Sequence, residues 1–152
     1  GSFSQAQPFG YEYRIVEVEY GQEPETTPTF RDLEKKQTWY HKAVAWASEN
    51  GIVYGSDAYH FNPTGNVTRE QIATFLYRYA TNIKGDDTSG RANLLAFPDG
   101  AKVSSFAKDA LAWANEAGIV NGKSISGKAY LKPQDNATRE EVAVLITAFC
   151  TK

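Results

Sequence analysis

The motif Thr-Arg-Glu occurs twice in the sequence, at residues 68–70 and at residues 138–140. A threonine in this position suits a helix N-cap, so each arginine is predicted to stand at the first position of a helix. A helix start carries partial positive charge and free N–H groups, and a guanidinium can add two parallel hydrogen bonds to a carboxylate. One interpretation is an anion-binding site in each copy, with both arginines exposed; the alternative is an ordinary capped helix start with a solvated arginine. The residues in question are Thr68, Arg69, Thr138 and Arg139.

Other reactive side chains give weaker signals. The two histidines, His41 and His60, lie outside any metal-ligand or nucleophile pattern. The single cysteine, Cys150, cannot form an internal disulfide, and its place in an apolar helical pattern is typical of a small buried packing residue. Asp32 and Asp99 stand shortly before predicted helices, which favours a turn or capping role over an acid–base pair. We therefore expect no catalytic residue, no metal site and no cofactor.

Both Thr-Arg-Glu motifs belong to an internal repeat, which is the strongest organising signal in the sequence. Each copy contains, in the same order, Phe-x-Asp, Ala-x-Ala-Trp-Ala, Gly-Ile-Val-x-Gly, a proline and Thr-Arg-Glu. Chance does not preserve such an order. The predicted organisation is an N-terminal strand-like segment and linker (1–29), a first repeat (30–80), an inter-repeat linker (81–96) and a second repeat (97–152).

The first helix of each copy is predicted to end on a glycine. In the first copy this helix runs from about residue 39 to residue 50, with apolar side chains at helical spacing. Gly51 takes the left-handed position after it, and Ile52 supplies the apolar contact of a Schellman-type ending. Trp46 and Trp113 lie mid-helix among Ala and Val, which predicts core packing and not sugar stacking.

The second helix of each copy is predicted to open on a capping box, because Gln71 follows Thr68 and Glu141 follows Thr138 at the required spacing. One such helix pair is too small to bury its apolar face, so the copies should pack on each other. The predicted fold class is mainly α: two helix-loop-helix repeats packed together, with a short N-terminal β-like segment.

Composition excludes two classes of partner. The 152 residues carry a formal net charge of −2, which gives no basic excess for nucleic-acid binding. No apolar run approaches the ~20 residues that a membrane span needs, so we expect no membrane insertion. Residues 1–3 resemble the scar of a removed tag and the chain contains no Met, so we expect a piece of a longer protein.

The repeated order of motifs resembles the S-layer homology repeat, over residues 30–80 and 97–150. The resemblance implies a non-catalytic module of a secreted protein, located at the cell wall or S-layer of a Gram-positive-type bacterium. Members of this family usually carry three repeats in a three-lobed helical spindle. They bind secondary cell wall polysaccharides, often through a pyruvate-bearing sugar, in grooves between lobes. Two repeats are visible here, so another repeat or another chain is expected to complete a three-lobed assembly.

The resemblance also assigns the ligand-contacting role to Arg69 and Arg139. Each is followed by a glutamate where the family motif has alanine, and this adds negative charge beside the anion site. The segments Gly55-Ser56 and Gly122-Lys123 are expected to be flexible and to bring backbone groups and Lys123 to the sugar. Trp39 and Tyr40 are expected to pack against a sugar ring.

Two other function classes compete with this interpretation. The first alternative is an enzyme that hydrolyses a wall glycan, but the sequence contains no catalytic motif that supports it. A protein-interaction or oligomerisation module without glycan binding is the second alternative, because two lobes of a three-lobed design leave an apolar face open.

Overall fold

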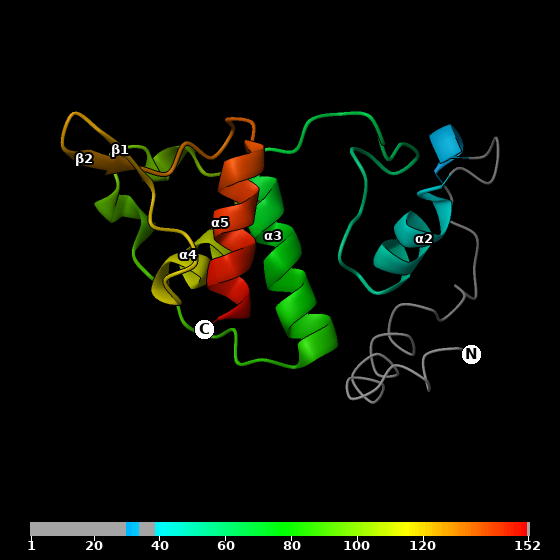
Figure 1. Ribbon diagram of the computed structural model, residues 1–152, viewed down its shortest axis with the longest axis horizontal. Helices are drawn as coiled ribbons and strands as arrows, with labels where there is room; N and C mark the ends of the chain where they lie inside the picture. The colour runs from blue at the N-terminus through cyan, green and yellow to red at the C-terminus, as the bar shows by residue number, and fades with distance from the viewer. Residues whose placement is uncertain (1–29, 34–38, 152) are drawn as a thin grey trace, which may run out of the picture. The chain divides into compact units, whose positions relative to one another are not determined.

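The computed structural model describes residues 30–33 and 39–151. The segment 1–29, predicted to be strand-like and linker, lies outside the described residues. The chain divides into two compact units, Gly1–Asn62 and Pro63–Lys152, each with its own hydrophobic core. The helices and the hairpin are drawn in Figure 1. None of the helices in the described residues is long and apolar enough to cross a membrane.

The unit that ends at Asn62 is built around helix α2, which spans His41–Glu49. The helix begins slightly later than predicted, because Trp39 and Tyr40 form a turn before it. The buried core consists of Phe30, Leu33 and Val44, and Tyr40 and Phe61 pack against it. Trp46, predicted to lie in the core, is half-buried.

The unit that starts at Pro63 contains three α-helices and one hairpin in its described part. The elements are α3 (Arg69–Tyr79), α4 (Lys108–Glu116), β1 (Lys123–Ile125), β2 (Lys128–Tyr130) and α5 (Arg139–Cys150). A single π-helical turn, Ala80–Lys84, extends α3. The two strands pair antiparallel, with Lys123 opposite Tyr130, so the segment predicted to be flexible at Gly122-Lys123 instead leads into a short hairpin.

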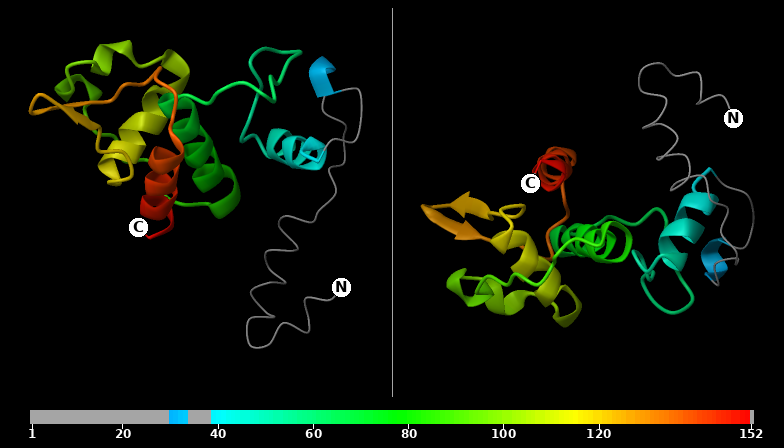
Figure 2. Two further views of the ribbon diagram at one scale, coloured as in Figure 1. Left: turned by 45° about the horizontal axis from the view of Figure 1, so that its top comes forward. Right: turned by 90° about the horizontal axis from the view of Figure 1, so that it is seen from below.

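Helix α3 packs against both α4 and α5, as Figures 1 and 2 show. Trp113 of α4 is 6% exposed and lies within the core, as predicted. Its ring contacts Tyr77 of α3 and Phe149 of α5, at centroid distances of 5.6 and 6.3 Å. Because α3 belongs to the first repeat and α4 and α5 to the second, the second helix of the first copy packs on both helices of the second copy, and the mainly α fold class is confirmed.

The predicted Schellman ending is present on both α2 and α4. Gly51 has φ of 69° and Gly118 has φ of 74°, the left-handed region that glycine occupies without strain. In α2, the N–H of Ile52 donates to the carbonyl of Ala47 at 2.8 Å, and the N–H of Gly51 donates to Ser48 at 3.1 Å. The same two bonds recur in α4, from Ile119 to Ala114 at 2.7 Å and from Gly118 to Asn115 at 3.0 Å.

The predicted capping boxes differ between α3 and α5. At α3 the box is complete: the N–H of Gln71 donates to Thr68 Oγ1, and the N–H of Thr68 donates to Gln71 Oε1 at 2.9 Å. At α5 the N–H of Glu141 donates to Thr138 Oγ1 at 3.2 Å, but the Glu141 carboxylate accepts from the Thr138 hydroxyl instead of its backbone. The other carboxylate oxygen of Glu141 is engaged by Arg69, which explains why this box is incomplete.

Cys150 at the end of α5 is exposed, so the prediction of a buried packing residue is wrong. The matching residue of the first copy, Ala80, directly follows α3 and is fully buried. The sequence pattern is the same in both helices, but α3 has α4 against this face.

Candidate functional site

A pocket of about 390 Å³ opens between α5, the start of α3 and the segment that joins α4 to β1. It brings together three residues of the sequence-based prediction: Arg69, Gly122 and Lys123. The other lining residues are Ile119, Val120, Asn121, Glu140, Glu141, Val144 and Leu145. The pocket therefore combines cations, carboxylates and an aliphatic wall.

Arg69 is held in this pocket from two sides. Its Nε donates to the carbonyl of Leu131 at 2.9 Å, and its guanidinium forms an ion pair with Glu141. Only 11% of its side chain is exposed, so the expectation of an exposed arginine is wrong at this position. The reason is that residues from the second repeat, distant in sequence, close over the start of α3.

Glu141 is the acidic centre of the pocket. Burial raises the pKa of its carboxyl, but hydrogen bonds from Thr138 and Arg69 and the charges of Arg69 and Lys123 outweigh burial, so the pKa lies below its ordinary value. The carboxylate is therefore ionised at neutral pH. Its Oε1 lies 3.8 Å from Lys123 Nζ, a looser contact than the one with Arg69.

The cations and the acids of the pocket balance formally, with Arg69 and Lys123 on one side and Glu140 and Glu141 on the other. Lys123 is much the more accessible cation, because 46% of its side chain is exposed. A flexible lysine whose ammonium is only loosely held can turn to an incoming anion at small cost. Lys123 is therefore the first cation that a ligand in this pocket would meet.

The backbone at the start of α3 does not offer free N–H groups to an anion, contrary to the sequence-based expectation. The N–H of Arg69 donates to the carbonyl of Asp135 at 2.9 Å, and that of Glu70 donates to Pro133 at 3.0 Å. The hydroxyl of Thr68 accepts the capping hydrogen bond from the N–H of Gln71, and the Thr68 backbone forms a β-bridge with Asn136. The loop of the second repeat covers this helix start.

Glu70 does not add charge to the pocket. Its side chain is buried, and its carboxylate accepts from the N–H and the hydroxyl of Ser104, at 3.0 and 2.6 Å. Gln134 approaches the same carboxylate at 3.3 Å. Glu70 therefore joins the two repeats, whereas its counterpart Glu140 is exposed and lines the pocket.

Gly122 shapes the pocket wall where α4 leads into β1. Its φ is 85°, and a Cβ there would approach the carbonyl oxygen of Tyr130 to 3.0 Å and the ring of Phe97 to 3.3 Å. Gly55 has the same conformation in the unit that ends at Asn62, with φ of 84°. Both glycines adopt a left-handed backbone conformation with close neighbours, which favours glycine. From the local sequence, this structural role cannot be distinguished from a role in ligand binding.

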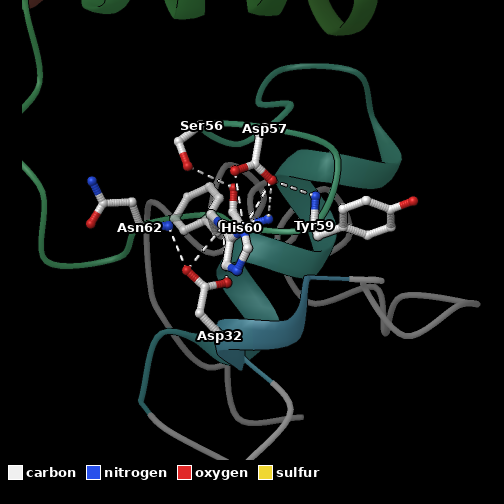
Figure 3. A network of polar contacts seen from close by, with 7 residues as sticks. Asp32, Ser56, Asp57, Tyr59, His60 and Asn62 are labelled. Atoms are coloured by element: carbon white, nitrogen blue, oxygen red, sulfur yellow. Dashed lines mark hydrogen bonds and ion pairs between the residues drawn. The ribbon is translucent and has the colours of Figure 1, made fainter.

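The remaining predicted residues do not line this pocket. Thr138 caps α5, and Arg139 is exposed beside it. Ser56 belongs to the other unit, where its hydroxyl donates to the carbonyl of His60 at 3.0 Å (Figure 3). In the same unit, Trp39 is 94% exposed and its ring lies edge-on to Tyr40 at 5.4 Å.

The two repeated aspartates hold loops and do not cap helices. Asp99 accepts from the N–H groups of Leu131 and Lys132, at 2.9 and 2.8 Å. Asp32 accepts in the same way from the N–H groups of Phe61 and Asn62, at 2.9 and 2.7 Å to the nearer carboxylate oxygen. Figure 3 shows the contact with Asn62. Burial raises the pKa of Asp32, but these backbone donors outweigh it, and the pKa lies below its ordinary value.

Among the described residues, no three His, Cys, Asp or Glu side chains are grouped so that they could hold a metal ion. Of the charged residues that line the pocket, Glu141 is one that sequence reasoning did not place in the candidate site. The capping-box pattern singled out Glu141, but only as a cap. Its charge partner is distant in the chain, and no local pattern signals such a contact.

Comparisons with known proteins match the repeats described above. The family model of the S-layer homology domain matches residues 29–73 and 96–143. The chain is 32% identical over 82% of its length to a surface-layer 125 kDa protein of Lysinibacillus sphaericus, and 31% identical over 77% of its length to an endoglucanase of a Bacillus species. It spans 10% and 12% of these relatives. A solved undecaheme cytochrome from the S-layer of Carboxydothermus ferrireducens is 32% identical, with a TM-score of 0.45, over 57% of this chain and 13% of that one.

Proposed function

This chain belongs to the S-layer homology domain family, and from this premise we propose that it is a non-catalytic module that anchors a protein to a secondary cell wall polymer. Family membership places it at the bacterial cell surface. A surface-layer protein and an endoglucanase share this segment over about a tenth of their length. Because these two proteins are of such different kinds, the segment that they share is better explained by a common location than by a common reaction.

The observation that carries the proposal is the pocket beside α5, where Lys123 and Arg69 lie next to an aliphatic wall. The proposed ligand is an anionic, pyruvylated glycan. A pyruvate ketal carries a carboxylate and a methyl group on one carbon. The carboxylate matches the accessible ammonium of Lys123, and the methyl group matches side chains such as Val144 and Leu145.

Arg69 contributes in a second step. Its guanidinium is paired with Glu141, so a ligand carboxylate that approaches it also meets the negative charge of Glu141. Lys123 binds the anion first, and Glu141 sets how much of the Arg69 charge the ligand meets. This arrangement favours a charged ligand that also fills the aliphatic wall over a simple anion.

The same pocket weighs against a glycan-hydrolysing enzyme. Hydrolysis of a glycosidic bond needs one carboxylic acid with a raised pKa to protonate the leaving group. The pKa of Glu141 is lowered by its partners, and its oxygens are engaged by Thr138 and Arg69. Such a carboxylate is a poor proton donor at neutral pH.

A second candidate function, a protein-interaction or oligomerisation module, has one observation in its favour. Two large apolar residues of α5 are exposed, Val144 to 65% and Ile146 to 45%. Association of the chain without affinity for wall polymer would support this function in place of anchoring.

The glycan proposal is tested by calorimetric titration with a pyruvylated disaccharide and with the same disaccharide lacking the ketal. We expect binding of the first only, weakened about 10- to 100-fold in Lys123→Gln through loss of a charge-assisted hydrogen bond. Lys128→Gln is the matched control, because Lys128 lies in the same hairpin but does not line the pocket. Equal binding of the two sugars would contradict the proposal that the ligand is anionic. Equal weakening of binding by both variants would contradict the proposal that this pocket is the binding site.

A further inference from the structure

The segment 117–134, which contains the β1–β2 hairpin, carries charge of one sign. It contains three lysines and no acidic residue, although the whole chain has a formal net charge of −2. The lysines are Lys123, Lys128 and Lys132. The matching loop of the first copy, residues 50–64, contains Asp57 and no lysine. The basic hairpin therefore belongs to the second copy alone, so a structural need common to both repeats does not explain it.

Two of these lysines lie beside one tyrosine at the base of the hairpin. Lys123 is paired directly with Tyr130 across the two strands, and side chains at paired positions lie on the same face of a sheet. Lys132 Nζ lies 5.4 Å from the centre of the Tyr130 ring. We call these three residues the hairpin-base cluster. Lys128 pairs with Ile125 at the opposite end of the hairpin, next to the turn.

The backbone holds Lys132 in place beside the ring. Its N–H donates to the buried carboxylate of Asp99 at 2.8 Å, and its φ is 50°, in the left-handed region. A residue other than glycine keeps such a conformation only where its surroundings enforce it. The ammonium is attracted to the electron-rich face of Tyr130. The cation and the ring are therefore already arranged before a ligand binds.

The hairpin-base cluster continues from the edge of the pocket. Lys123 lines the pocket, whereas Tyr130 and Lys132 do not. A ligand that meets the Lys123 ammonium therefore finds an aromatic ring and a second ammonium just outside the pocket. Tyr130 and Lys132 are half-buried, which leaves part of each side chain open to solvent. Figure 1 shows the hairpin at the edge of its unit.

We propose that the hairpin-base cluster is a second subsite, which binds the next charged unit of the anionic polymer whose first unit occupies the pocket. This inference rests on the proposed function. The ring of Tyr130 offers an apolar surface to one face of a sugar, and Lys132 offers its ammonium to the anionic substituent. Charge favours this occupant, because a polymer that repeats a negative charge can meet two lysines at once, whereas a single charged sugar meets only Lys123.

The test compares three probes by calorimetric titration. They are a disaccharide with one pyruvate ketal, a tetrasaccharide with one ketal on its terminal unit, and a tetrasaccharide with a ketal on each of its two disaccharide units. The doubly charged tetrasaccharide should bind the wild type about 3- to 10-fold more tightly than the disaccharide does. The tetrasaccharide with one ketal should gain less affinity, because it offers no anion to Lys132.

Four variants assign the gain to particular residues. Lys132→Gln should bind the disaccharide as the wild type does and should lose most of the gain from the second ketal. Tyr130→Leu should weaken both tetrasaccharides, and it leaves the backbone pairing of the strands unchanged. Lys123→Gln should weaken all three probes, since this lysine lines the pocket. Lys128→Gln is the matched control, because it removes the same charge at the far end of the hairpin and should leave all three affinities unchanged.

Each contrary result has a distinct meaning. A doubly charged tetrasaccharide that gains no more than about twofold, the statistical value for two equivalent ketals, would overturn the second subsite and leave the pocket in place. An equal loss of the gain in Lys132→Gln and Lys128→Gln would also overturn it, because the overall charge of the hairpin would then attract the polymer. If the disaccharide itself does not bind, the proposed function fails, and the second subsite fails with it.

Discussion

The guanidinium of Arg69, at the start of α3, forms an ion pair with the carboxylate of Glu141, in the first turn of α5. The pair joins the two repeats across the pocket, and only 11% and 16% of the two side chains are exposed. It has two consequences: it couples stability to pH, and it withholds the charge of Arg69 from a ligand.

Glu141→Gln should reduce stability at neutral pH by about 1–2 kcal/mol, because a charge-assisted bond is lost and Arg69 stays in place. The folded-state pKa of Glu141 lies below its ordinary value of 4.5. A lowered pKa contributes stability that is present above the unfolded value and is lost as pH falls through the folded value. The gap between wild type and variant should therefore shrink as the pH drops below about 4.5. Urea unfolding of both proteins at neutral and acidic pH measures this difference in stability.

Glu140→Gln is the matched control, since Glu140 is exposed and makes the same change of charge one residue away. It should leave stability within about 0.5 kcal/mol of the wild type, as surface substitutions usually do. A Glu141→Gln deficit that did not change with pH would show that the carboxylate acts through packing and not through its charge.

The two loop-holding aspartates should differ in their effect on stability. Asp99 is 6% exposed, so Asp99→Ala leaves the N–H groups of Leu131 and Lys132 without an acceptor in a buried place. We expect a loss of about 1–3 kcal/mol. Asp32 is exposed, and water can replace its carboxylate, so Asp32→Ala should cost less. Chemical denaturation gives both values, and amide exchange at Leu131 and Lys132 localises the effect; equal losses would contradict this account.

Gly122→Ala should destabilise the chain more than Gly127→Ala. Both glycines have φ near 80°, so both alanines carry the same left-handed strain of about 1 kcal/mol. A Cβ at Gly122 also meets Tyr130 and Phe97, whereas nothing lies within 4 Å of one at Gly127. The difference between the two melting temperatures isolates the steric part. If the two variants melted together, the close approach at Gly122 would not constrain the fold.

The features predicted correctly from the sequence depend on residues close together in the chain. The glycine endings of α2 and α4 and the threonine caps of α3 and α5 follow from the needs of a helix end. The repeat added one long-range conclusion, that helices of the two copies pack together, and α3 does pack on α4 and α5. Trp113 in the core follows from the same reasoning.

The features that the sequence could not indicate depend on which segments meet in space. The burial of Arg69, the loss of free N–H groups at the start of α3 and the role of Glu70 all come from loops of the second repeat. Identical motifs then diverge: Arg69 is buried and paired, whereas Arg139 is exposed. Cys150 shows the same effect, since its pattern predicts burial but no described neighbour covers it.

The role proposed for this chain is to anchor a protein to a polymer of the bacterial wall. The most direct measurement is sedimentation of the chain with purified Gram-positive wall sacculi, before and after hydrofluoric acid removes their secondary polymers. We predict that wild type and Lys128→Gln sediment with intact sacculi, that Lys123→Gln sediments poorly, and that stripping abolishes sedimentation for all three. Sedimentation that survives stripping, or that Lys123→Gln leaves unchanged, would contradict polymer anchoring through this pocket.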